Sequence, residues 1–134
     1  MNLRDTSKLL YQLKLANQKM TTLFEQDTGF SITRYELLLF LRESGPCSQT
    51  VLQTQLQIDS AAVTRHLKLL EEADYVRRER NPENQREVFV KLTEEAKAAL
   101  AHCEQEHACT RKRPLPLSET EERTLLALLT KLVK

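Results

Sequence analysis

The side chains most suited to chemistry lie in one stretch near the C-terminal end, where histidine, cysteine and glutamate follow one another closely. Cys103 and His107 are four residues apart and share a face of a helix, while His102, Glu106 and Cys109 share another. A thiolate and an imidazole at this spacing suit Zn²⁺. The spacing equally fits a core position for Cys103 and a partly buried, hydrogen-bonded His107. Both interpretations stay open on spacing alone.

The three cysteines also bear on redox chemistry and compartment. Cys47, Cys103 and Cys109 are an odd number without a disulfide-like pattern, which favours reduced thiols in the cytoplasm. Cys103 and Cys109 face differently on a helix, so a bond between them within one chain is not expected, whereas a bond across a dimer stays open. All three are candidates for thiol oxidation.

The chain shows no signal peptide and no run of 18 apolar residues, so we expect no membrane association.

Enzyme chemistry finds little support. The sequence has no glycine-rich phosphate loop, no Gly-x-Ser-x-Gly and no recognisable nucleophile for its 3 histidines. We therefore predict a protein that is not an enzyme and requires no cofactor, with zinc as a candidate ligand only.

The 134 residues suffice for one domain, or one domain with a helical extension, and 2 glycines with 5% aromatic residues favour helices. The net charge of +1 does not decide the partner.

Two helices are predicted before residue 47. The first spans residues 3–24 and carries an apolar stripe. The stripe consists of Leu9, Leu13, Ala16, Met20 and Leu23. Asp27-Thr-Gly interrupts the pattern, and Thr33 with Glu36 reads as a capping box that opens a second helix over residues 34–43. Gly45 and Pro46 end this second helix.

Two further helices, joined by a tight connection, are the most informative part of the sequence. A short helix follows Ser48, and Asp59 caps the next one. The buried face of that second helix is expected to contain Val63, His66, Leu67 and Leu70. Its outward face is small, polar and basic, and contains Ser60, Ala61, Thr64, Arg65 and Lys68.

A change of period after Asp74 predicts a β-hairpin. The β-rich segments 75–80 and 86–92 flank a five-residue tip, 81–85. Thr93 is expected to cap a fifth helix that runs to about Thr110, and a basic, proline-stopped connector follows from Arg111. Ser118 and Glu121 form a capping box before a leucine-rich last helix, residues 125–133.

This order predicts a mainly α protein with a small β-hairpin wing, an α+β winged helix-turn-helix, over residues 48–92. Arg65 can make bidentate bonds to a guanine edge, and the cations of the hairpin, Arg78, Arg80 and Arg86, can reach a minor groove or phosphates. Double-stranded DNA is the expected partner. Alternatives are a solvated hairpin on another α+β domain and a winged-helix module that binds a protein.

Several motifs resemble the MarR family of bacterial regulators, and the resemblance covers almost the whole chain. These motifs are Ile32-Thr-Arg-Tyr-Glu-Leu-Leu38, Asp59-Ser-Ala-Ala-Val-Thr-Arg-His-Leu-Lys-Leu-Leu-Glu71, the Asn-Pro wing tip, Val90-Lys-Leu-Thr-Glu-Glu-Ala96 and Leu117-Ser-Glu-Thr-Glu-Glu122. The resemblance implies an obligate homodimer. Residues 1–30 and 93–134 would form a shared helical dimerisation layer, and residues 31–92 the DNA-binding lobe. The apolar stripes of the first and last helices independently favour a partner chain.

The resemblance also implies a function: a cytoplasmic repressor that binds a near-palindromic operator and responds to a small-molecule, thiol-oxidising or metal effector. In zinc-responsive members, two histidine ligands match Cys103 and His107, a carboxylate matches His102, and another ligand matches Glu36. The family's cysteine on the first helix, used by peroxide sensors, is absent. Asn84-Gln85-Arg86 replaces the family's Asp-Arg-Arg at the wing, and Asp74 replaces a glycine, with tolerance of the left-handed conformation expected.

Overall fold

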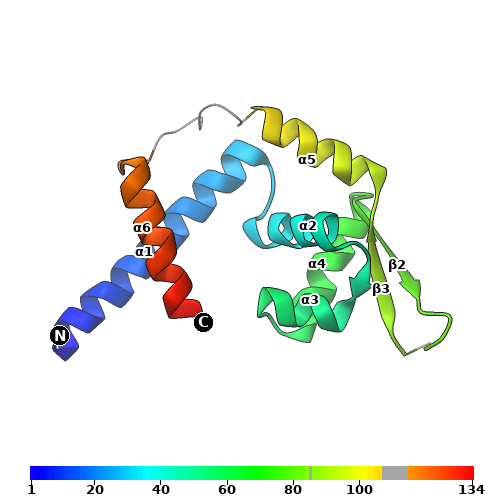
Figure 1. Ribbon diagram of the computed structural model, residues 1–134, viewed down its shortest axis with the longest axis horizontal. Coiled ribbons are helices and arrows are strands. Elements are labelled where there is room, and N and C mark those ends of the chain that lie inside the picture. Colours follow the sequence, from blue (N-terminus) through cyan, green and yellow to red (C-terminus); the bar gives the residue numbers. More distant parts are fainter. Residues whose placement is uncertain (85, 107–114) are drawn as a thin grey trace. The chain divides into compact units, whose positions relative to one another are not determined.

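The computed structural model describes residues 1–84, 86–106 and 115–134 (Figure 1). The chain divides into two units, residues 1–104 and 105–134. Within the described residues, none of the helices combines the length and the apolar character needed to cross a membrane.

Helix α1 spans Leu3–Thr28 and is longer than the apolar stripe predicts. The Asn2 side chain accepts a hydrogen bond from the Asp5 backbone at its start. The Asp27-Thr-Gly segment ends the helix, as predicted, because Gly29 is its C-cap and has a φ of 78°, which suits a residue without Cβ. None of the residues of α1 is buried within the described chain.

Helix α2 spans Ile32–Ser44, so it begins before the predicted start. Ser31 is the N-cap, with extended backbone and no side-chain cap bond, and Thr33 already lies inside the helix. The predicted capping box of Thr33 and Glu36 is therefore wrong. The Tyr35 ring packs on Phe24 of α1 and on Phe30, with centroids 5.3 and 5.6 Å away, which joins α1 to the start of α2. Gly45 ends the helix, as predicted.

Helices α3, Gln49–Leu56, and α4, Ser60–Glu72, have the predicted caps. The Ser48 hydroxyl accepts from the Val51 backbone at 3.2 Å, and the Asp59 carboxylate accepts from the Ala62 backbone at 2.7 Å. Between the helices, Gln57 adopts a left-handed conformation with φ of 55°. The tight connection predicted between the two helices is confirmed.

The wing is a three-stranded antiparallel sheet in the order β1-β3-β2, rather than the two-stranded hairpin predicted. Strand β1 spans Cys47–Ser48, β2 Val76–Arg80 and β3 Val88–Leu92. The segment between β2 and β3 spans residues 81–87 and is longer than the predicted tip, 81–85. The backbone N–H of Asn81 donates to the carbonyl of Glu87 at 2.9 Å and closes this segment. Arg86 consequently lies in this connection and not in a strand.

The core lies where α2, α3, α4, the sheet and α5 meet. Its fully buried large side chains are Leu37, Leu38, Leu52, Val63, Leu67, Val90 and Leu100. Asp74 has a φ of 61°, which confirms the expected left-handed conformation. Its carbonyl accepts from the Thr93 hydroxyl at 2.6 Å, and this hydroxyl accepts from the Ala96 backbone, which caps α5, Glu94–Glu106. The expected end of the fifth helix near Thr110 lies outside the described residues.

Helix α6 spans Glu119–Val133 and opens with the predicted capping box of Ser118 and Glu121. Its apolar side chains are largely uncovered in the described chain, and Leu126 and Leu132 are each 66% exposed. A helix whose leucines have no cover of their own is typical of a surface that packs against another chain.

Candidate nucleic-acid interface

Helix α4 divides into a buried face and an exposed face as predicted. Val63, Leu67 and Leu70 are at most 3% exposed and anchor the helix in the core. The opposite face is exposed along its whole length and consists of Ser60, Ala61, Thr64, Arg65 and Lys68. We call these five residues the reading face. It is a regular helical surface with short side chains near its start and cations further along.

His66 lies between the two faces and is partly buried, as expected for an inward residue. Its Nδ1 lies 3.2 Å from Nη1 of Arg34 on α2. A guanidinium can only donate, so Nδ1 must be the acceptor and the imidazole is neutral. Burial, together with the nearby Arg34 and Arg65, lowers the pKa of His66. His66 therefore links α4, the helix that carries the reading face and is called the reading helix below, to α2. It does not serve as an exposed ligand.

The structure brings Arg86 of the wing connection close to the start of the reading helix. A small cleft of about 200 Å³ is lined by Ser60, by Arg86 and Glu87, and by the first residues of α3. A wider hollow of about 590 Å³ lies between the outer side of α3 and the wing, and Arg86 lines it too. Arg86 thus lies beside Ser60, the first residue of the reading face.

Sequence reasoning missed the part that α3 plays in this surface. Gln49 and Thr50 line the small cleft beside Ser60 and Arg86. Ser48 caps this helix, and the cap is the sequence signal that points to Gln49 and Thr50. A capped helix start next to a cationic loop favours contacts with anions.

The side chains of Asn81 and Asn84 brace the wing connection. The Asn84 side-chain oxygen accepts from the Arg86 backbone at 3.1 Å. Asn81 donates to the Glu87 carboxylate at 3.1 Å and accepts from the Glu83 backbone at 3.0 Å. The neutral amides therefore supply the hydrogen bonds that hold this loop without an acidic residue at position 84.

Arg78 has a different environment from Arg86. Its Nε forms an ion pair with the Glu71 carboxylate in the last turn of α4. Both side chains are about one third exposed. Arg80, two residues further along β2, is exposed. The arginines that the sequence analysis assigned together to the wing thus have different environments. Arg78 is paired with α4, whereas Arg86 lies in the connection between β2 and β3.

The residues considered for zinc are only partly described. Cys103 is buried at 9% exposure, whereas Glu36 and His102 are exposed. Throughout residues 1–84, 86–106 and 115–134, no three His, Cys, Asp or Glu side chains lie close enough to hold a metal ion. His107 lies outside those residues, so the zinc site stays a prediction.

Of the two thiols in the described residues, Cys47 is partly buried and Cys103 is buried. Cys47 lies in β1, and burial raises the pKa of its thiol, which favours the unreactive protonated form. Cys103 packs in the core region of α5, in agreement with the simpler interpretation of its spacing. Cys109 lies outside the described residues, and thiol oxidation also stays a prediction.

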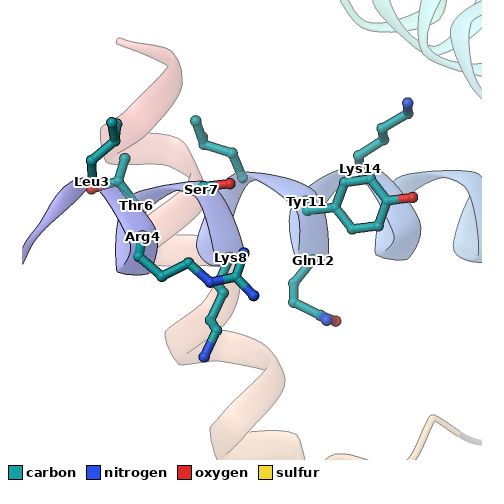
Figure 2. Close-up of a pocket in the computed structure, with 9 residues that line it drawn as sticks. Leu3, Arg4, Thr6, Ser7, Lys8, Tyr11, Gln12 and Lys14 are labelled. Carbon is teal, nitrogen blue, oxygen red and sulfur yellow. The ribbon is translucent and has the colours of Figure 1, made fainter.

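The first half of α1 carries a further hollow, of about 810 Å³ (Figure 2). All of its lining residues belong to this one helix, between Leu3 and Lys14. Lys14 lies near the Tyr11 ring, with its Nζ 5.8 Å from the centroid. A single helix does not enclose a ligand, so we assign no small molecule to this hollow.

Two helices joined by a tight turn, an exposed polar face on the second helix, and an adjoining sheet with a cationic loop define a winged helix-turn-helix protein. A model of the MarR family matches residues 30–88. The uncharacterized HTH-type transcriptional regulator YdgJ of Bacillus subtilis (strain 168) is 40% identical over 122 residues, which cover 91% of this chain and 74% of that protein. The chain belongs to the MarR family, a family of DNA-binding transcriptional regulators and not of enzymes.

Solved structures agree with this assignment. A crystal structure of a mutant of MarR from E. coli, complexed with operator DNA, has a TM-score of 0.80 and 26% identity, with all of both chains covered. Reduced AbfR bound to DNA has a TM-score of 0.76, with 98% of this chain and 96% of that chain covered, and at 22% identity supports the fold alone.

Proposed function

We propose that this protein is a transcriptional repressor that binds a near-palindromic DNA operator as a homodimer. The observation that supports this most directly is the reading face of α4, which is exposed and combines small side chains at its start with the cations Arg65 and Lys68. An α-helix of this kind fits the major groove of B-form DNA.

Each part of the surface has its own task in the proposed complex. Arg65 donates two hydrogen bonds to a guanine edge, and Thr64 and Ser60 bond to a neighbouring base or phosphate. Ala61 adds no bulk, so the helix can approach the base pairs closely. Arg86 contacts the adjacent backbone or minor groove from the wing connection.

The proposed homodimer follows from uncovered apolar surface. On α1, Leu9, Leu10 and Leu15 are more than 40% exposed, and on α6 Leu126 and Leu132 are 66% exposed. A second copy that covers these leucines would present two reading helices to one side of the duplex. The half-sites would then lie about one helical turn, roughly 10 bp, apart.

Repression would follow from occupation of the promoter, because a bound dimer excludes polymerase from the same DNA. The dimer can adopt one state whose α4 helices fit two consecutive grooves and another whose α4 helices do not. An effector, either a small molecule or a metal ion, releases the DNA if it binds the second state more tightly than the first. The ratio of these two affinities sets the extent of release.

A selection from a pool of random duplexes tests the DNA-binding part of this proposal. We expect the wild-type protein to enrich a sequence with two related half-sites. Arg65→Ala should weaken binding to the enriched duplex by roughly 1–3 kcal/mol and relax its sequence preference. Lys97→Ala is the control, since it also removes one positive charge, from an exposed position on α5. Equal losses in both variants would contradict the assigned reading face.

Salt dependence separates DNA binding from a winged-helix module that binds a protein. Phosphate neutralisation makes the affinity for random duplex fall steeply and linearly on a log-log plot against salt concentration. A weak or absent dependence, together with a failure to enrich any sequence, would contradict the proposed function.

A further inference from the structure

The ion pair between Arg78 and Glu71 joins the wing to the reading helix. Glu71 lies in the last turn of α4, and Arg78 lies in the middle of β2, seven residues later. With about one third of each side chain exposed, the pair is shielded from solvent more than an ordinary surface pair. It therefore links two elements that both face the proposed DNA site.

The backbone places Arg78 on the inner side of the wing. Alternate residues of a strand face the same side, so Arg78 shares a side of β2 with Val76, which is 2% exposed. Across the sheet it pairs in register with Val90, which is 0% exposed. The side chain thus extends from the core-facing side of the wing toward α4.

Glu71 continues the reading face toward the end of α4. It follows Lys68 by three residues and Thr64 by seven, which places it on the same stripe of the helix. A carboxylate on this stripe would repel DNA phosphates. The guanidinium of Arg78 neutralises this charge while it holds the wing against the helix.

We propose that Arg78 is a positioning residue that acts on DNA recognition through Glu71. Their ion pair sets the angle between the wing and the reading helix, so that Arg65 and Arg86 reach the duplex together, and it offsets the charge of the Glu71 carboxylate. This inference rests on the proposed function. It differs from the expectation drawn from the sequence, in which Arg78 touches DNA itself.

The test compares affinities for two duplexes of equal length, one enriched by the wild-type protein and one of random sequence. Their ratio cancels most of the effect of a changed net charge. Arg78→Ala should lower this ratio about tenfold, which corresponds to about 1.4 kcal/mol. In a Glu71→Ala background the same substitution should lower the ratio less than threefold, because the partner is already lost.

The charge exchange Glu71→Arg with Arg78→Glu is the decisive variant. We expect it to restore the ratio to within about threefold of the wild-type value, since the ion pair is re-formed with reversed partners. A direct contact predicts the opposite, because a glutamate at position 78 would then face a phosphate or a base. Arg78→Lys keeps a cation within reach of Glu71 and should retain most of the ratio even if the alanine variant folds poorly.

The salt dependence supplies a second readout. Arg86→Ala should reduce the slope of log affinity against log salt by about one, and adding Arg78→Ala to that variant should reduce it no further, because Arg78 contacts Glu71 and not a phosphate. A slope reduced by about one more in the double variant, or a charge exchange that melts normally without restoring the ratio, would overturn the inference while leaving the proposed function intact. A wild-type protein that enriches no duplex would instead remove the proposed function and this inference with it.

Discussion

Arg34 of α2 and His66 of α4 are hydrogen-bonded, with 3.2 Å between Nη1 and Nδ1. The contact joins the helix that precedes the helix-turn-helix to the inner side of the reading helix. Because arginine only donates, the bond requires a neutral imidazole. Protonation of His66 would replace this hydrogen bond by repulsion between two cations.

The first prediction concerns the pH dependence of stability. Burial, Arg34 and Arg65 lower the pKa of His66 in the folded protein below the ordinary value of 6.5. Below about pH 6.5 the unfolded chain therefore binds a proton that the folded chain resists, and stability falls as the pH decreases toward the folded-state pKa. Above about pH 6.5 the hydrogen bond of neutral His66 contributes fully to the free energy of unfolding.

Urea unfolding at pH 5.5 and 7.5 measures this effect. His66→Gln retains a side-chain oxygen that can accept from Arg34 but cannot be protonated in this range, so it should reduce the loss of stability between the two pH values. His102→Gln, on an exposed position of α5, is the matched control and should behave like the wild type. An unchanged pH dependence in His66→Gln would contradict the prediction.

The second prediction concerns the turn between α4 and the wing. Asp74 has a φ of 61°, and its carbonyl accepts from Thr93. A β-branched residue is strongly disfavoured in this conformation, so Asp74→Val should lower the free energy of unfolding by about 1–3 kcal/mol. Asp74→Gly should change it by less than about 1 kcal/mol, because relief of the backbone is offset by a more flexible unfolded chain. Chemical denaturation measures both, and equal effects would argue against strain at this position.

The third prediction concerns the wing connection. The Asn84 side-chain oxygen holds the backbone of Arg86. Asn84→Ala should weaken binding to the enriched duplex several-fold with little change in melting temperature, since the loop is exposed and lies outside the core. Asn84→Asp keeps the acceptor and should bind at least as well as Asn84→Ala. Fluorescence anisotropy measures the affinities, and no loss in Asn84→Ala would exclude the bracing role.

The fourth prediction concerns the homodimer. Leu126 is 66% exposed on α6, so a glutamate at this position disturbs no core of the described chain but opposes burial in an interface. Leu126→Glu should shift the protein toward monomers in sedimentation experiments and weaken binding to the enriched duplex. Thr124→Glu places the same charge on the opposite side of α6 and should remain dimeric. A wild-type protein that sediments as a monomer would contradict the proposed assembly.

Local patterns in the sequence predicted the features that depend on neighbouring residues. The caps at Ser48, Asp59, Thr93 and Ser118 were all recognised, because each is a hydrogen bond between residues three apart. The two faces of α4 followed from helical periodicity for the same reason. The wrong capping box at Thr33 shows the limit, since the helix begins at Ile32 with Ser31 as its N-cap, and the packing of Phe30 and Tyr35 accompanies this earlier start.

Tertiary structure decided which distant groups meet. Strand β1 has two residues, too few to show an alternating pattern, and exists because β3, more than 40 residues later in the chain, pairs with it. The partner of Arg78 likewise depends on the turn at Asp74, which directs β2 back along α4. The sequence alone determined the winged helix-turn-helix and its reading face, because periodicity and capping are local. The different settings of Arg78 and Arg86 required the fold, because the environment of a charge is set by the elements that pack around it.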